Sequence, residues 1–318
     1  MTDSAAISRP HPSIALGALM VAASALLFSS KAVVVKCAYP LGVDVVTLLA
    51  LRMGIALPIF LAVAWREERR AAAPLAAVDL ARCVGLGVLG YYVASLLDFH
   101  GLRFIGVGLE RMVLYIYPTI VVLVGAIVLR QRLGRTILIA LAATYAGIGL
   151  IYAGQSAVGT EVGLGVALVA GSAIAYAFFI LLSGPVIARL GSQRVMAIAM
   201  SGACVVVLLH KGCAWALGAG PPPVRLPAQV YGYGAILAIL GTVAPSLLMG
   251  EGLKRVGSQR FVIISTIGPV GTVLLGWAVL GEVVSLLNVG GMALTVAASV
   301  AMGLSKARPA VISEPRSR

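Results

Sequence analysis

The sequence predicts an all-α integral membrane protein, with ten transmembrane helices arranged as two inverted five-helix repeats. Three observations predict this fold. Of 318 residues, 60% are hydrophobic and 11% are charged, with a mean hydropathy of +1.04, whereas a soluble domain carries about 25% charged residues. The apolar residues form blocks about as long as a membrane-spanning helix. The second half of the chain also resembles the first at an offset of 151 residues.

Ten apolar blocks are long enough to cross a bilayer, whose core of ~30 Å needs about 20 helical residues. They are residues 14–36, 45–65, 82–102, 107–129, 136–153, 162–184, 195–216, 230–253, 259–280 and 285–304. The longest connections, 66–81 and 217–229, are charged or rich in turn residues, as loops are. We interpret the first block as a true span, because it is too long for the apolar region of a cleaved signal.

Positive charge is distributed unequally between the two sides of the predicted bundle. With the N-terminus inside, 17 of the 24 Lys and Arg residues lie in inside segments and 4 in outside segments. Cytoplasmic segments carry such an excess. We therefore expect a multi-pass protein of the bacterial inner (plasma) membrane, with both termini cytoplasmic. The net charge of +13 does not indicate nucleic-acid binding, because the basic residues lie between apolar blocks rather than on one face.

The two halves repeat without a gap over Gly101–Gly134 at the offset of 151, so that Gly101 pairs with Gly252 and Pro118 with Pro269. In the first helix the offset is 148, and Gly17 pairs with Gly165. Five helices per copy make the second copy enter the membrane from the opposite side. This inversion explains why the turn "RQRLGR" is basic while its equivalent "GEVVS" has no Lys or Arg.

The repeat predicts the organisation of the chain and the place of a site. We expect a cytoplasmic tail at 1–13, a first repeat at 14–153, a linker at 154–161, a second repeat at 162–304 and a cytoplasmic tail at 305–318. Inverted repeats are typical of secondary transporters, whose substrate site lies between the repeats near the middle of the membrane.

Several motifs are specific enough to indicate a family: "LLFSSKAVVVK", "LLALRM", "GLERMVLYIYPTIVVLVGAIVLRQRL" and "VLGE". With them, the chain resembles the EamA-type permeases of the drug/metabolite transporter superfamily over residues 14–304. The first copy departs from the family pattern, with Arg130-Gln131 in place of the Gly-Glu found at Gly281-Glu282. The resemblance implies an inner-membrane exporter of a metabolite or amino acid that works by alternating access.

Five ionisable side chains fall within the outer half of the first repeat, where such groups face a cavity or a partner. They are Lys31, Arg52, Asp98, Glu110 and Arg111. The cations outnumber the acids by one, which favours a zwitterionic or anionic small-molecule substrate. We predict that the three cations bind this substrate. Asp98 and Glu110, the only carboxylates expected within spans, are the predicted proton carriers.

Polar and aromatic side chains share faces of the predicted helices at i, i+4 and i+7, and such faces point toward a water-filled pathway. The triplets are Ser24, Phe28, Lys31; Ser172, Tyr176, Phe179; Tyr91, Ser95, Asp98; Thr242, Ser246, Met249; and Arg111, Tyr115, Pro118. Tyr115, Tyr176 and Ser265 complete the predicted substrate-binding set. The Ser265 carbonyl loses its helical donor at Pro269, as that of Leu114 does at Pro118.

Each of these residues also has a structural interpretation. Lys31 could reach outward to the membrane surface. Arg52 with Asp98, and Arg111 with Glu110 or Asp98, could be structural ion pairs. The aromatic side chains could serve packing, and Pro118 and Pro269 could be passive kinks rather than hinges.

The predicted function is secondary active transport of a small metabolite, an amino acid or organic acid, in the direction of export. The chain has no GxxxxGK[ST] motif for ATP binding, which leaves coupling to protons, antiport or no coupling. The alternatives are a channel or facilitator and, with less support, a membrane-embedded lipid enzyme, against which three scattered histidines argue. No CxxC motif exists, so we expect no metal site, disulfide or cofactor. A homodimer is compatible with the sequence.

Overall fold

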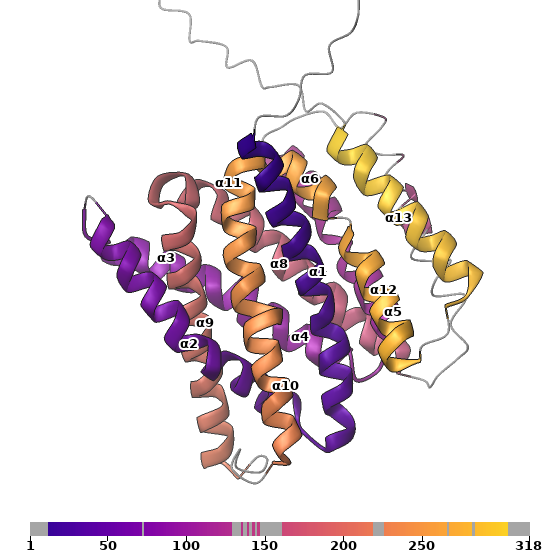
Figure 1. Cartoon of the computed structure of the whole chain (residues 1–318), viewed down its shortest axis with the longest axis horizontal. Helices are drawn as coiled ribbons and strands as arrows, with labels where there is room; N and C mark the ends of the chain where they lie inside the picture. The colour runs from indigo at the N-terminus through magenta and orange to yellow at the C-terminus, as the bar shows by residue number, and fades with distance from the viewer. Residues whose placement is uncertain are drawn as a thin grey trace, which may run out of the picture.

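The computed structural model describes residues 12–71, 73–128, 161–218, 226–265, 267–281 and 284–304, with a few separate positions between 135 and 146. Across these residues the chain is helical, and they contain no strand (Figure 1). Several predicted features lie wholly or mostly outside the described residues. They are the fifth span at 136–153, the linker, both tails, the basic turn at 130–135 and Glu282.

The first half of the chain begins with two long helices joined by a tight turn. Gly42 takes a left-handed conformation in this turn (φ 78°), and Asp44 caps the next helix by accepting the Thr47 amide at 2.9 Å. The helices of this half are α1 (Pro12–Ala38), the 3-10 turn η1 (Tyr39–Leu41), α2 (Val45–Arg70), α3 (Ala77–Gly87), the π-helical η2 (Val88–Val93), α4 (Ala94–Gly101), α5 (Val107–Leu114) and α6 (Tyr117–Val128).

The second half repeats this order. Its first two helices are separated by Gly191 alone, whose φ of 86° and ψ of 145° lie where only glycine is unstrained. The helices are α8 (Val162–Leu190), α9 (Ser192–Ala216), α10 (Ala228–Ala238), the π-helical η4 (Ile239–Val243), α11 (Ala244–Ser265), α12 (Ile267–Leu280) and α13 (Leu286–Leu304). In Figure 1, α13 lies at one edge of the bundle.

Six described helical segments are long and apolar enough to cross a membrane, so the chain is a multi-pass membrane protein. They are Ile14–Leu41, Val45–Arg70, Ala77–Gly101, Val162–Leu190, Ser192–Ala216 and Ala228–Val256. They correspond to six of the ten predicted spans. The described residues do not confirm the full set of ten, because two other predicted spans differ from the structure and 136–153 falls outside it.

The predicted span 107–129 is interrupted at Tyr115–Ile116, between α5 and α6 and just ahead of Pro118. The separation between the predicted spans 230–253 and 259–280 is wrong, because α11 continues as helix through residues 254–258 to Ser265, the last residue described before Ile267. An i, i+4 ion pair supports the helix there, with Arg255 Nε donating to Glu251 Oε1 at 2.9 Å. Pro269 carries no amide hydrogen that could bind the Ser265 carbonyl.

The two halves match in detail at the offset of 151. The bounds of α3 map directly onto α10, and the π-helical η2 maps onto η4. The close helix contacts are repeated as well. A Cβ added at Gly101 would lie 2.5 Å from Val169 Cγ2, and one added at Gly252 would lie 2.7 Å from Val21 Cγ2. Only glycine allows these helices to pack so closely.

Equivalent helices of the two halves run in opposite directions. In the contact between α2 and α9, Arg194 lies against Glu68 at one end and Lys211 lies near Asp44 at the other. The second helices of the two halves are therefore antiparallel. Around them, α1 packs on α11 and α12, while α8 packs on α4, α5 and α6. This exchange of contacts encloses a space between the halves.

Candidate functional site

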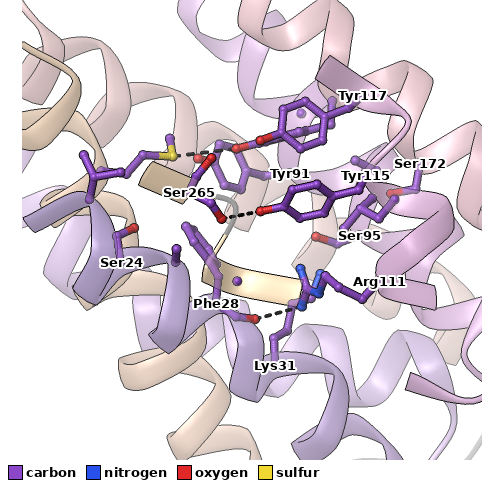
Figure 2. Close-up of a pocket in the computed structure, with 18 of the residues that line it drawn as sticks. Ser24, Phe28, Lys31, Tyr91, Ser95, Arg111, Tyr115, Tyr117, Ser172 and Ser265 are labelled. Carbon is purple, nitrogen blue, oxygen red and sulfur yellow. Dashed lines mark hydrogen bonds between the residues drawn. The ribbon is translucent and has the colours of Figure 1, made fainter. Parts of the chain in front are cut away.

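A cavity of about 120 Å³ lies between the two halves and is lined by α1, α2, η2, α4, α5, α6, α8, α11 and α12. Its volume is below the about 300–1,000 Å³ of pockets that hold drug-sized ligands. All six predicted substrate-binding residues line it, namely Lys31, Arg52, Arg111, Tyr115, Tyr176 and Ser265. Several of them are drawn in Figure 2. The arrangement suits a small molecule with at least one charged group.

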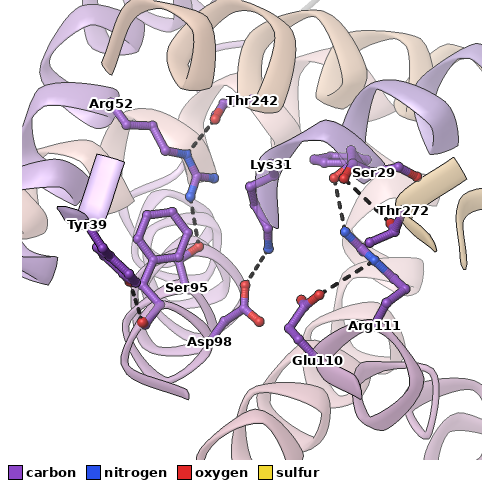
Figure 3. A network of polar contacts seen from close by, with 12 residues as sticks. Ser29, Lys31, Tyr39, Arg52, Ser95, Asp98, Glu110, Arg111, Thr242 and Thr272 are labelled. Atoms are coloured by element: carbon purple, nitrogen blue, oxygen red, sulfur yellow. Dashed lines mark hydrogen bonds and ion pairs between the residues drawn. The ribbon is translucent and has the colours of Figure 1, made fainter. Parts of the chain in front are cut away.

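Arg52 holds a buried positive charge that no described carboxylate within 4.0 Å neutralises. Its side chain comes from α2 and is 2% exposed. Its Nε donates to Thr242 Oγ1 at 2.5 Å and its Nη1 donates to Ser95 Oγ at 3.3 Å (Figure 3). The guanidinium also lies 5.5 Å from the centre of the Phe99 ring. These partners are neutral, so they orient the guanidinium and leave its charge available to an anion.

Asp98 pairs with Lys31, not with Arg52. Lys31 Nζ lies 2.5 Å from Asp98 Oδ2, and the two side chains are 12% and 1% exposed. The predicted alternative of an Arg52–Asp98 ion pair is therefore wrong, and so is the alternative that Lys31 reaches outward to the membrane surface. The physical reason is desolvation, since a buried carboxylate and a buried ammonium each need a partner. Asp98 itself does not line the cavity, but it orients Lys31, which does.

Glu110 and Arg111 form a looser pair at the edge of the same network (Figure 3). Arg111 Nε lies 3.8 Å from Glu110 Oε2, and Arg111 Nη2 donates to the Phe28 carbonyl at 3.1 Å. Among the described residues, no hydrogen-bond donor reaches either buried oxygen of Glu110, whose side chain also lies against the carboxyl group of Asp98. Asp98 and Lys31 also act electrostatically on Glu110. Two acids and two cations thus interact beside the cavity, with Arg52 as the additional charge.

Four tyrosines line the cavity, namely Tyr91, Tyr115, Tyr117 and Tyr176. Tyr117 lies edge-on to Tyr176 and Tyr115, with centroids 5.2 and 5.8 Å apart. Phe179, which does not line the cavity, packs against this cluster, 5.8 Å from Tyr176 and 5.2 Å from Tyr91. Such contacts stabilise the aromatic cluster itself. The lining of the cavity therefore combines cationic and aromatic side chains, which together match an anionic group attached to an apolar body.

Tyr115 also links the two halves of the chain. Tyr115 donates its hydroxyl hydrogen to the Ser265 carbonyl, which Pro269 leaves without its helical donor (Figure 2). The helix break of the first half is thus bound to α11 of the second half. The position of Pro269 in the sequence predicts that the Ser265 carbonyl has no helical donor. That the Tyr115 hydroxyl takes this place is shown only by the structure.

The two hydroxyls that bind Arg52 lie within or just after the two π-helical segments. Ser95 follows η2 by two residues, and Thr242 lies within η4. Thr242 in turn donates to the Leu237 carbonyl at 2.8 Å, five residues back, so the wider π turn is satisfied internally. π-helical turns occur frequently at functional sites. Here both point polar side chains at the same guanidinium.

Sequence reasoning missed Tyr117 as a lining residue. A continuous helix would place it off the face shared by Arg111 and Tyr115, and the break at Tyr115–Ile116 turns it into the cavity. Pro118 was the available signal, because residues that precede a proline prefer non-helical conformations. Pro118 lies within α6, one residue after Tyr117.

Comparisons with known proteins agree with this architecture. The sequence matches the EamA-like transporter family twice, over residues 15–153 and 163–304. It is 31% identical over 280 residues to "Uncharacterized transporter YcbK" of Bacillus subtilis (strain 168), covering 87% of this chain and 89% of that protein. A solved crystal structure, 19% identical, aligns with a TM-score of 0.62 over 90% of this chain and 96% of its own, which shows the shared fold alone. These family and relative names indicate a membrane transporter rather than an enzyme. The two matches together cover most of the chain, which therefore belongs to the EamA-like transporter family.

Proposed function

We propose that this transporter is a secondary active exporter of a small anionic or zwitterionic metabolite, an amino acid or an organic acid. The observation that carries the proposal is Arg52. A buried guanidinium without a carboxylate partner is costly in a membrane interior, and it lies in the wall of the central cavity. A carboxylate or other oxyanion on the substrate is the missing partner, since guanidinium binds such groups through two parallel hydrogen bonds.

The proposed mechanism is alternating access by two inverted five-helix halves. Its support is the antiparallel contact of α2 with α9 and the helix break at Tyr115–Ile116, ahead of Pro118. A site between two oppositely oriented halves can be opened to either side by rocking one half against the other. We place the protein in the bacterial inner membrane with both termini cytoplasmic, on the basis of the 17 to 4 distribution of basic residues.

Counterflow in proteoliposomes tests this proposal. Vesicles loaded with one unlabelled amino acid or organic acid are diluted into a trace of the same labelled compound. A carrier is expected to give transient accumulation of label that saturates with concentration, because loaded carriers exchange faster than empty ones return. Uptake that rises linearly without saturation would instead show a channel, and turnover of lipid without flux would show an enzyme.

Coupling to protons is assigned to the acidic residues beside the cavity. Asp98 holds Lys31 at 2.5 Å, so a proton on Asp98 would release that cation. Glu110 interacts with Asp98 and Arg111 and has no donor to hold it ionised at hydrogen-bond distance in the described part of the chain. Glu110 is therefore the group that can take up a proton without breaking a hydrogen bond. Asp98, which interacts with Glu110 and pairs with Lys31, transmits the resulting change in charge to Lys31.

The variant Glu110→Gln is expected to separate exchange from proton coupling. A gradient of one pH unit supplies about 1.4 kcal/mol per proton, which can drive roughly tenfold accumulation. We expect Glu110→Gln to lose this accumulation and to retain counterflow, since the cations of the cavity remain. Glu251→Gln is the matched control, because its carboxylate pairs with Arg255 within α11, away from the cavity. Normal gradient-driven accumulation by Glu110→Gln would remove Glu110 from the coupling mechanism.

A further inference from the structure

A second hollow lies between α3 and α8, apart from the central cavity and sharing no lining residue with it. It has a volume of about 610 Å³. Its walls are apolar, formed mainly by Leu86, Leu89, Leu182 and Val186. Two arginines line the same groove, Arg82 from α3 and Arg189 from α8. The groove therefore combines an apolar wall with strong positive charge.

The two arginines converge on a single acid. Arg82 Nη1 lies 3.3 Å from Asp79 Oδ1, and Arg189 Nη2 contacts the same oxygen. Two cations on one carboxylate leave one net positive charge. Their side chains are 56% and 53% exposed, so the two guanidiniums, with five N–H donors each, remain accessible from outside the groove. Asp79 holds the two guanidiniums together without neutralising them.

The position of the groove determines what can occupy it. Arg82 lies near the start of the span Ala77–Gly101 and Arg189 near the end of the span Val162–Leu190, so both lie where a membrane surface is expected. From Arg82 to Leu89, and from Arg189 to Leu182, each helix passes about 10 Å into the membrane. An occupant must therefore carry negative charge at the surface and an apolar chain below it.

We propose that this groove binds an anionic phospholipid, with its phosphate on Arg82 and Arg189 and an acyl chain along the leucine wall. Guanidinium groups suit phosphate oxygens, and basic pockets between transmembrane helices bind anionic lipid headgroups. In the orientation proposed above, the lipid comes from the cytoplasmic leaflet. Gly85 lines the groove, and a Cβ added there would meet no atom within 4 Å, so the space beside it is open.

The test is thermal unfolding of the delipidated full chain in detergent, with and without dioleoyl phosphatidylglycerol. A ligand present at 100 times its dissociation constant is expected to raise the unfolding temperature by about 5–10 °C. Phosphatidylcholine at the same concentration controls for unspecific lipid binding. Glycerol 3-phosphate, which carries a phosphate on glycerol but no acyl chain, controls for simple anion binding. Neither control is expected to shift the transition.

Variants separate the site from the rest of the surface. The double variant Arg82→Gln/Arg189→Gln is expected to lose the phosphatidylglycerol shift. The matched double variant Lys254→Gln/Arg255→Gln removes two exposed cations from α11 and is expected to keep it. Gly85→Leu fills the groove while both arginines remain, and it too should lose the shift. This variant keeps the test valid if the double variant folds poorly.

The lipid proposal has clear contrary results. An equal shift with phosphatidylcholine would show unspecific lipid binding, and an equal shift with glycerol 3-phosphate would show an anion site without a lipid. A full shift in either groove variant would place the lipid elsewhere. None of these readouts depends on transport, so they stand or fall separately from the proposed exporter.

Discussion

Arg52→Gln is expected to lower the affinity for an anionic substrate by about 100-fold or more. Glutamine can still donate to Thr242 or Ser95, the two hydroxyls that hold Arg52, but it carries no charge. Removing one partner of a buried charge pair costs about 2–5 kcal/mol, and each 1.4 kcal/mol is a factor of ten. Arg52→Lys keeps the charge and loses the paired geometry, so we expect an intermediate loss. The measurement is the concentration dependence of counterflow in proteoliposomes.

Two controls distinguish substrate binding from a structural role of Arg52. Arg103→Gln removes an exposed cation from the loop between α4 and α5, near the same end of the bundle, and is expected to transport normally. The amount of each variant in the membrane and its elution from size-exclusion chromatography report folding. If Arg52→Gln fails to accumulate, the residue is structural. If it accumulates and transports with unchanged affinity, it does not bind substrate.

Helical periodicity predicts part of the set of side chains that line the central cavity. Lys31 and Tyr115 were placed on polar faces by their spacing of three and four residues from other polar or aromatic residues. Side chains at such spacings share a face whatever the neighbouring helix is. A membrane helix with one polar face cannot turn that face toward lipid at low cost. The cavity between the two halves is an environment that accepts such a face.

Pairing between helices could not be predicted in the same way. Asp98 is equally compatible in sequence with Arg52 and with Lys31, and the choice depends on how closely α1 and α4 approach in space. The π-helical turns were also invisible, because η2 and η4 contain ordinary apolar residues. The separation between the predicted spans 230–253 and 259–280 was also wrong. Lys254 and Arg255 suggested a connection there, whereas both lie within α11, where an ion pair accommodates Arg255.

At the end of the bundle opposite Asp44, an ion pair joins the two halves. Arg194 of α9 binds Glu68 of α2 through both carboxylate oxygens, at 2.7 and 2.8 Å, and also donates to the Ala73 carbonyl at 3.1 Å. Beneath this pair lies an apolar cluster that includes Cys83 and Val195. At the other end, the corresponding contact of Asp44 with Lys211 is longer, 3.8 Å. For the alternating-access mechanism proposed above, we infer that the Glu68–Arg194 end is the closed one.

Arg194→Gln is therefore expected to shift the carrier toward the conformation open at the Glu68–Arg194 end. Hydrogen bonds to charged groups contribute about 1.5–3 kcal/mol, so the open population should rise by about 10-fold or more. Cys83 is the natural reporter, since it is free and fully buried under the pair. With Cys37, Cys204 and Cys213 replaced by serine, labelling of Cys83 by a membrane-impermeant maleimide should accelerate by the same factor. In the proposed orientation, this occurs from the cytoplasmic side.

The exchanged variant Glu68→Arg/Arg194→Glu makes this prediction specific to the pair. It restores opposite charges across α2 and α9, so Cys83 labelling should return toward the slow rate of the parent protein. Arg255→Gln breaks an exposed ion pair within α11 and should leave the rate unchanged, because exposed pairs contribute little. Slow labelling of Cys83 in Arg194→Gln would mean that the apolar cluster alone keeps this end closed. Alternating access would then have to be controlled by packing between α2, α3, α8 and α9 rather than by charge.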